Sequence, residues 1–237
     1  MGSWVGPAVT SGSRLLVPAA MLRGRIELHL ACYDLHSGGL LWNTPLVTGQ
    51  RPINMFGRLL EEFVAPPPVV HGDQVLMQTQ LGAVCSVDLF TGELRWKSLY
   101  DQIPFTPGTY YNKGELRSLW RNMPPVVVGN TLLATPFDSP HLLGLDLDSG
   151  TVLWEASHTD LNAQAGIAGR SGVLDALLGA QGDRVYFAGS KVAAFQAPRG
   201  LDRQAPMHRV WLYPPITRLS SYSRSEEHTS ELQSRRN

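Results

Sequence analysis

The 237-residue sequence has no excess of either charge, few cysteines and no long hydrophobic run. Lysine plus arginine and aspartate plus glutamate each number 20, so there is no basic field for nucleic acid and no acidic field for cationic partners. No apolar run approaches the roughly 18 residues that span a bilayer. The apolar stretch from Leu15 to Leu22 is interrupted by Pro18, which makes it a poor signal peptide. We therefore expect no nucleic-acid partner and no membrane span in this chain.

The two cysteines are Cys32 and Cys85. Cys32 lies two residues before Asp34, and Cys85 lies three residues before Asp88, the equivalent position of the repeat described next. On strands this offset places the two side chains on opposite faces. We therefore expect no disulfide between them and interpret both as small, buried apolar residues.

A nine-residue pattern occurs three times, at 34–42, 88–96 and 146–154. Each copy begins with Asp, has Ser or Thr three residues later followed by Gly, and ends with Trp four residues after the Gly. Because both ends keep their spacing, the pattern is an internal repeat. Its fixed residues are Asp34, Gly38, Trp42, Asp88, Gly92, Trp96, Asp146, Gly150 and Trp154.

The segments upstream of each nonapeptide predict strands. Residues 7–17, 68–79 and 125–135 each read as a short strand, a tight turn at glycine and a second strand. A third strand leads into the Asp, whose carboxylate can accept backbone N–H groups across a turn, while the Gly takes the left-handed conformation. The fourth strand carries the Trp. Four antiparallel strands per tandem unit predict an all-β fold, a β-propeller of four-stranded blades.

A fourth, degenerate unit follows. It has a turn at Gly182-Asp183, Gln196 in place of the Asp, and Trp211 eleven residues after Gly200. We therefore expect about four blades, arranged as an open partial ring within residues 1–223. Their approximate ranges are 4–46, 65–99, 123–157 and 174–213.

The Asp–Gly–Trp pattern resembles the repeat of the pyrroloquinoline-quinone (PQQ) propeller superfamily over roughly residues 4–213. WD-repeat (WD40-like) and kelch propellers fit less well, because their signature residues are missing. The resemblance implies rings of seven or eight blades, and a group that includes quinoprotein dehydrogenases and a non-enzymatic outer-membrane assembly lipoprotein. It also implies that Trp42, Trp96 and Trp154 lock neighbouring blades together. A periplasmic or other extracytoplasmic bacterial location is implied in the same way.

Residues 224–234 resemble the translation of a sequencing-adapter oligonucleotide. We expect 224–237 to be a non-native, disordered tail. On this interpretation the native protein continues past Ser223, the chain is a fragment, and C-terminal blades are missing. An open arc leaves two blade faces without neighbours, so residues 1–223 alone are not expected to form a compact monomer.

The three connections between blades are long, at 46–67, 99–124 and 156–175, and they share one end of the blades with the loops between second and third strands. Propellers commonly bind at such a face. The candidate binding residues there are Arg51, Arg58, Tyr110, Tyr111, Arg117, Trp120 and Arg121. In the alternative, the aromatic residues and an amphipathic segment at 54–63 pack the loops onto the blades, and the charges are solvated.

The sequence shows no catalytic, cofactor or metal constellation, and the seven histidines lack metal-ligand spacing. The favoured hypothesis is a non-catalytic PQQ-like scaffold that binds a protein or ligand through its loops, without cofactor. The first alternative is a fragment of a PQQ- and Ca²⁺-dependent alcohol or sugar dehydrogenase, for which vicinal cysteines and acidic metal ligands are expected. The second is a sensor propeller domain of a larger protein.

Overall fold

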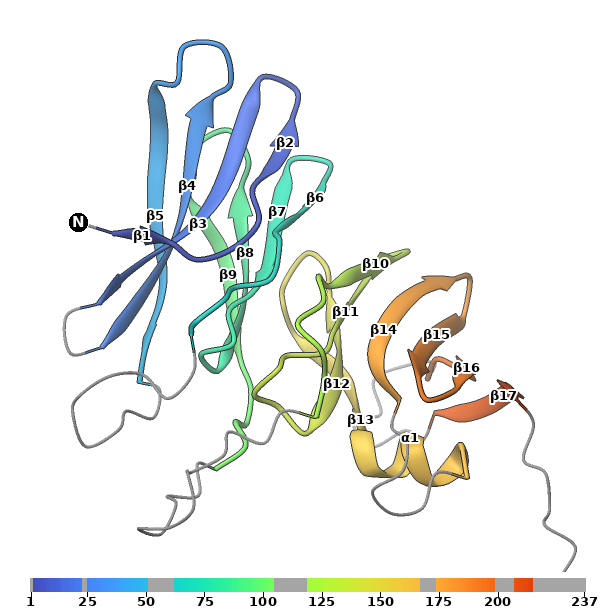
Figure 1. Cartoon of the computed structure of the whole chain (residues 1–237). Coiled ribbons are helices and arrows are strands. Elements are labelled where there is room, and N and C mark those ends of the chain that lie inside the picture. Colours follow the sequence, from blue (N-terminus) through green and yellow to red (C-terminus); the bar gives the residue numbers. More distant parts are fainter. Residues whose placement is uncertain are drawn as a thin grey trace, which may run out of the picture.

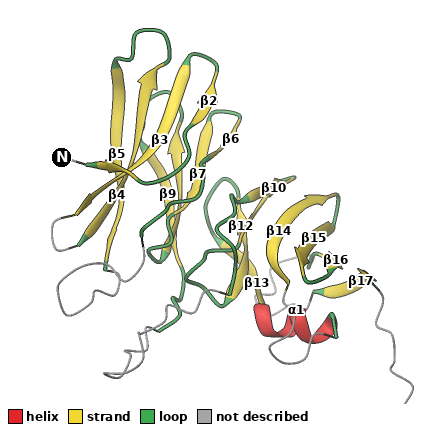
Figure 2. Ribbon diagram, in the orientation of Figure 1, coloured by secondary structure: helices red, strands yellow, loops and turns green. Residues whose placement is uncertain are grey.

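The computed structural model describes residues 2–22, 25–50, 62–104, 119–166, 174–198 and 207–214. In these ranges the chain forms four antiparallel sheets that follow one another along the sequence, and one short helix, α1 (His158–Gln164) (Figures 1 and 2). The all-β fold built from four antiparallel sheets confirms the predicted fold class. No helix within the described ranges has the length and apolar character needed to cross a membrane. The predicted tail at 224–237 lies outside the described residues.

The first sheet is larger than the repeat predicts. It contains β1 (Ser3–Trp4), β2 (Val9–Ser11), β3 (Arg14–Leu22), β4 (Ile26–Asp34) and β5 (Leu40–Gly49). Both β1 and β2 pair with β3, at different points along it. Pro18 lies between these two pairings, where its carbonyl accepts the N–H of Val5 at 3.1 Å. No residue of β1 or β2 pairs with Pro18, so no carbonyl there needs the backbone N–H that proline lacks. Proline is therefore tolerated inside this nine-residue strand.

The other three sheets have the predicted four strands in consecutive order. The second contains β6 (Val69–His71), β7 (Gln74–Gln78), β8 (Ala83–Asp88) and β9 (Leu94–Leu99). The third contains β10 (Val126–Val128), β11 (Thr131–Ala134), β12 (His141–Asp146) and β13 (Val152–Ser157). The fourth contains β14 (Leu174–Gln181), β15 (Arg184–Gly189), β16 (Val192–Gln196) and β17 (His208–Tyr213).

The register around the tryptophan is the same in every sheet. Trp42 pairs with Cys32, Trp96 with Ser86, Trp154 with Gly144 and Trp211 with Ala194. In each sheet the register shifts directly after the residue of the third strand that pairs with the tryptophan. Trp211 therefore occupies the repeat position in the fourth sheet, although its hairpin is longer and lacks the Asp.

The hydrophobic core is divided among the interfaces between successive sheets. Alternate residues of β4, such as Leu28 and Leu30, pack against the second sheet, where Val75 and Met77 meet them. Equivalent clusters lie between the second and third sheets and between the third and fourth. Each interior sheet therefore buries both faces, whereas the first and fourth sheets each have one face with no other described sheet against it (Figure 1).

The two cysteines lie in the same core, between the first and second sheets. Cys32 and Cys85 are both fully buried and both free. They do point to opposite faces of their own sheets, but they belong to neighbouring sheets, and those two faces meet in one core. The prediction that strand faces keep the two cysteines apart is therefore wrong, although both are free.

Candidate functional site

The three repeat hairpins share one hydrogen-bond pattern. In the second sheet, Oδ1 of Asp88 accepts the N–H groups of Phe90 at 2.8 Å and Thr91 at 2.9 Å. In the first and third sheets, Oδ1 of the equivalent aspartate accepts the N–H and the hydroxyl of the serine three residues later. These bonds favour the ionised carboxylate, so the pKa values of Asp34 and Asp146 lie below the ordinary value.

Arg95 adds an ion-pair network in the second sheet. Its Nη2 lies 2.6 Å from Oδ2 of Asp73 and 2.5 Å from Oδ2 of Asp88. The guanidinium is the main cause that holds the pKa of Asp88 well below its usual range, and the turn N–H groups add to the effect. The repeat carboxylates are therefore occupied by their own turns and by this arginine.

The repeat tryptophans join neighbouring sheets. The indole N–H of Trp42 donates to the carbonyl of Leu89 at 3.2 Å, and that of Trp96 donates to the carbonyl of Leu147 at 3.0 Å. Each ring covers the hairpin glycine of the next sheet so closely that a Cβ atom at Gly92 would lie 2.6 Å from Trp42, and one at Gly150 would lie 2.4 Å from Trp96. At Gly150 a φ of +71° adds a second reason for glycine.

A polar network around one buried carboxylate ties loops together at the other end of the blades. We call this end the connection face; it comprises the loops 79–82 and 135–140 and the described parts of the connections, 62–67, 99–104, 119–124 and 158–166. The centre of the network is Asp138, which is 7% exposed. The carboxylate of Asp138 accepts the hydroxyl of Tyr100 and Nε2 of Gln102, each at 2.6 Å, and the N–H of Gly82 at 3.2 Å. Its carbonyl accepts the N–H of Ile103 at 2.7 Å.

A second set of bonds extends this arrangement across the face. Nε2 of Gln80 donates to Oδ1 of Asn122, and Nδ2 of Asn122 donates to the carbonyl of Val64 at 2.9 Å. Gln80 has a φ of +56°, which is uncommon for a residue other than glycine. Val64 and Leu99 remain 43% and 72% exposed, so the anchored loops present apolar side chains to solvent.

The predicted binding residues are only partly placed. Arg51, Arg58, Tyr110, Tyr111 and Arg117 lie outside the described residues. Trp120 is 1% exposed, with its ring 4.6 Å from that of His158, edge to face, so it packs the connection as the alternative interpretation expects. Arg121 is exposed and forms an ion pair with Asp175 at 3.0 Å.

Helix α1 connects this face to the fourth sheet. Oδ1 of Asn162 accepts the N–H of Leu174 at 2.7 Å, where β14 begins. His158, at the start of α1, is buried beside Trp120, and burial lowers the pKa of its imidazole. From its sequence this segment is predicted only as part of a connection between blades.

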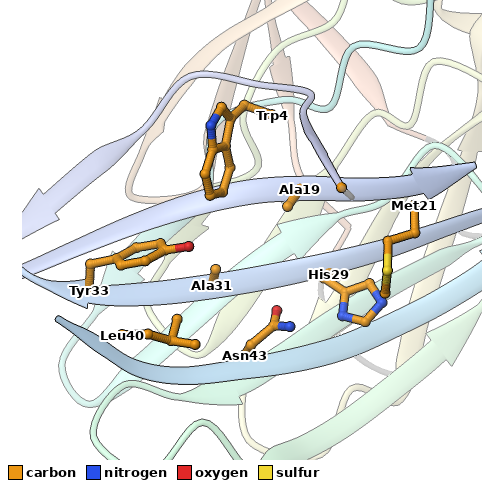
Figure 3. Close-up of a pocket in the computed structure, with 9 residues that line it drawn as sticks. Trp4, Ala19, Met21, His29, Ala31, Tyr33, Leu40 and Asn43 are labelled. Carbon is orange, nitrogen blue, oxygen red and sulfur yellow. The ribbon is translucent and has the colours of Figure 1, made fainter. Parts of the chain in front are cut away.

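A concave feature lies on the outer face of the first sheet. Its cavity of about 180 Å³ is bordered by Trp4, Met21, His29, Tyr33 and Asn43, among others (Figure 3). His29 is 9% exposed, and neither of its ring nitrogens has a hydrogen-bond partner among the described residues. Trp4 is 63% exposed and packs edge to face on Tyr33 at 5.9 Å.

The residues that the structure describes do not fit a PQQ and Ca²⁺ site. Within the described ranges no three side chains of His, Cys, Asp or Glu gather as metal ligands. The repeat aspartates are held by their turns, and burial raises the pKa of the Cys85 thiol to about 12. The dehydrogenase alternative would require two cysteines adjacent in sequence, and Cys32 and Cys85 are far apart.

Comparisons with known proteins agree on the fold. The sequence model of a family described as outer membrane protein assembly factor BamB matches residues 27–205. The crystal structure of BamB from Moraxella catarrhalis aligns with 88% of this chain at a TM-score of 0.52 and 12% identity. The quinohemoprotein alcohol dehydrogenase from Comamonas testosteroni aligns with 89% at a TM-score of 0.50 and 12% identity.

The chain spans about half the length of that BamB structure and about a third of the dehydrogenase, with 50% and 35% of those chains covered. At this identity the two likenesses show the fold alone. A search of curated protein sequences finds no match.

Proposed function

The chain belongs to the BamB family of PQQ-like β-propeller repeat proteins, and on this premise we propose that it is a non-catalytic scaffold that binds a protein partner through its connection face. In this proposal the protein uses no cofactor and works outside the cytoplasm, in the assembly of outer-membrane proteins that the family description names.

The observation that carries the proposal is the combination of hydrogen-bonded loops with exposed apolar side chains. Asp138, Tyr100 and Gln102 fix loops from two sheets, and Asn122 fixes a third segment. Val64 and Leu99 stand exposed on these loops, with the cationic Arg121 also exposed on the same face. Loops held in place before binding lower the entropic cost of association, and apolar residues beside an arginine are typical of protein interfaces.

The dehydrogenase alternative has less support. Its only support is the likeness in fold to an alcohol dehydrogenase, and fold alone does not imply activity. In the described part of the chain no three His, Cys, Asp or Glu side chains gather as metal ligands, and the repeat aspartates accept hydrogen bonds from their own turns.

Site-specific photocrosslinking tests the proposal. A photoreactive amino acid replaces Leu99, and the matched control replaces Phe90, which is 58% exposed but lies on a repeat hairpin at the opposite end of the blades. In cells that make the protein, we expect one discrete adduct from position 99, identified by mass spectrometry as a single protein, and none from position 90.

A second variant checks that the contact involves the face. Val64→Asp, introduced into the protein labelled at position 99, is expected to reduce the adduct at least tenfold, because it places a charge on the apolar surface. Equal adduct yields at positions 90 and 99, or no adduct at position 99, would contradict the proposal.

A further inference from the structure

The amide of Asn162 faces the imidazole of His158 in a fixed orientation. Its oxygen, Oδ1, accepts the N–H of Leu174 at 2.7 Å. Its nitrogen, Nδ2, donates to the carbonyl of His158 at 2.9 Å and lies 3.2 Å from Nε2 and 3.5 Å from Nδ1 of the imidazole. A neutral imidazole has one ring nitrogen that accepts an N–H, whereas the imidazolium has two donors and no acceptor. The amide therefore suits the neutral ring, and protonation of His158 sets donor against donor.

The imidazole is also enclosed. His158 is buried, and its ring packs edge to face on Trp120, whose ring lies 6.0 Å from that of Phe187. Burial lowers the pKa of the imidazole, and the carbonyl of Leu174 and the carboxylate of Asp175 offset only part of this effect. A proton therefore binds His158 more readily when the ring reaches water than when it is packed.

Among the described residues, Asp175 is the one charge that acts on the imidazole of His158. It is shared with Arg121, whose Nε lies 3.0 Å from Oδ1 of Asp175. Lys191 and Arg209 bind carbonyls at the C-terminal end of α1, and donors from the second sheet occupy the carboxylate in the loop 135–140. The other charged or titratable residues on the elements around α1 are Asp138, His141, Glu155, Asp160 and His208.

The contacts around His158 also hold the connection 119–124 in place. Trp120 is inserted in the core between the third and fourth sheets. The N–H of Arg121 donates to the carbonyl of Asp175, at the start of β14, at 2.7 Å. The next residue, Asn122, joins this connection to the preceding one. His158 therefore lies where α1, the start of β14 and the connection 119–124 meet.

We propose that His158 is a pH-sensitive latch of the connection face: when the imidazole takes up a proton, it leaves its place between Trp120 and Asn162, and the connection 119–124 separates from α1 and the start of β14. The closed arrangement holds the neutral ring, and the open one exposes the imidazolium to water. The ratio of open to closed protein can therefore rise by up to about tenfold for each pH unit below about 6.5. The latch concerns contacts within the chain, so it does not depend on the function proposed above.

Hydrogen exchange at single amides of the complete protein, followed by NMR, tests the latch. The reporters are the N–H groups of Leu174 and Arg121, whose hydrogen bonds cross the latch. The control is the N–H of Leu89, which donates to a backbone carbonyl at 2.8 Å in the second sheet. Protection is the exchange rate of the unfolded chain divided by the measured rate at the same pH, so it removes the direct effect of pH on exchange.

Between pH 7.5 and 5.5 we expect the protection of Leu174 and Arg121 to fall by about threefold to tenfold. One proton with an ordinary pKa of about 6.5 allows no larger change over this range. The protection of Leu89 should stay the same, because its sheet has no part in the latch. Unchanged protection at Leu174 and Arg121, or an equal fall at Leu89, would overturn the proposal.

Two histidine variants assign the effect. His158→Gln is expected to remove the pH dependence, because glutamine does not titrate but still offers an oxygen to the amide of Asn162. This loss is expected whether the variant keeps the site closed or leaves it open at every pH. His36→Gln is the matched control, since His36 is exposed on the repeat hairpin of the first sheet, and it should keep the wild-type response.

The NMR titration of the His158 ring is a second measurement on the unaltered chain. We expect its midpoint below about pH 6.5, with the indole signal of Trp120 changing over the same range. A pH dependence of protection that persists in His158→Gln would refute the latch, and so would a ring that titrates at or above about pH 6.5.

Discussion

Replacing Trp96 with alanine tests the claim that the repeat tryptophans hold the sheets together. The ring is 8% exposed, lies in the core between the second and third sheets, and covers Gly150. Removing a buried tryptophan costs about 3–5 kcal/mol, from the lost transfer free energy and the cavity left behind. The carbonyl of Leu147 also loses its donor.

Two further variants divide this cost. Trp96→Phe keeps most of the apolar contact but removes the indole N–H, so it is expected to cost about 1–2 kcal/mol for the lost hydrogen bond and the smaller ring. Trp42→Ala is expected to cost less than Trp96→Ala, because Trp42 is only half-buried.

Urea unfolding of the complete protein, followed by far-ultraviolet circular dichroism, measures these changes. In thermal unfolding of a chain of this length, a loss of about 3–5 kcal/mol in the free energy of unfolding corresponds to a fall in Tm of about 6–20 °C. A cost below about 1 kcal/mol for Trp96→Ala would refute the role of Trp96 in joining the sheets.

Three other predictions follow from the same geometry. Gly150→Ala should destabilise the fold by about 2–5 kcal/mol, because it combines a positive φ with a clash against Trp96. The control Gly129→Ala has a positive φ but open space around it, so it should cost about 1–2 kcal/mol in the same unfolding assay. Equal costs would contradict the packing of Trp96 on Gly150. The Cys85 thiol, whose pKa burial raises to about 12, should resist a thiol reagent at pH 8 until denaturant is added, and rapid labelling of the native protein would refute its burial. Burial lowers the pKa of His158, so the unfolded chain takes up a proton there more readily than the folded one. The free energy of unfolding should therefore fall as the pH drops below about 6.5. His158→Gln should reduce this dependence on pH, which unfolding curves at pH 7.5 and 5.5 would show.

The architecture could be predicted from the sequence because its determinants are local and repeated. An aspartate, a hydroxyl residue and a glycine within five positions define each hairpin, and the hydrogen bonds to Asp34, Asp88 and Asp146 follow that pattern. The strand order of the second and third sheets follows from these turns. Even the degenerate fourth unit keeps the register, with Trp211 opposite Ala194.

The sequence predicts that the connections share one face, but the contacts within this connection face could not be predicted in the same way because they join distant segments. Asp138 meets Tyr100 and Gln102, which precede it by 38 and 36 residues, and no spacing rule relates them. The extra strand β1 was also missed, because two residues at Ser3–Trp4 have no periodicity, and their pairing depends on the length of β3 beyond Pro18. The exposed position of Leu99 follows from where β9 ends rather than from its hydrophobicity.

We propose that the protein is a non-catalytic scaffold rather than a quinoprotein. The most direct measurement is a titration of the purified protein with PQQ and Ca²⁺, followed by tryptophan fluorescence and by dye reduction with an alcohol substrate. We predict no saturable change in fluorescence and a dye-reduction rate equal to that of the protein-free control. Stoichiometric PQQ binding, with dye reduction that requires the protein, PQQ and Ca²⁺ together, would contradict the account.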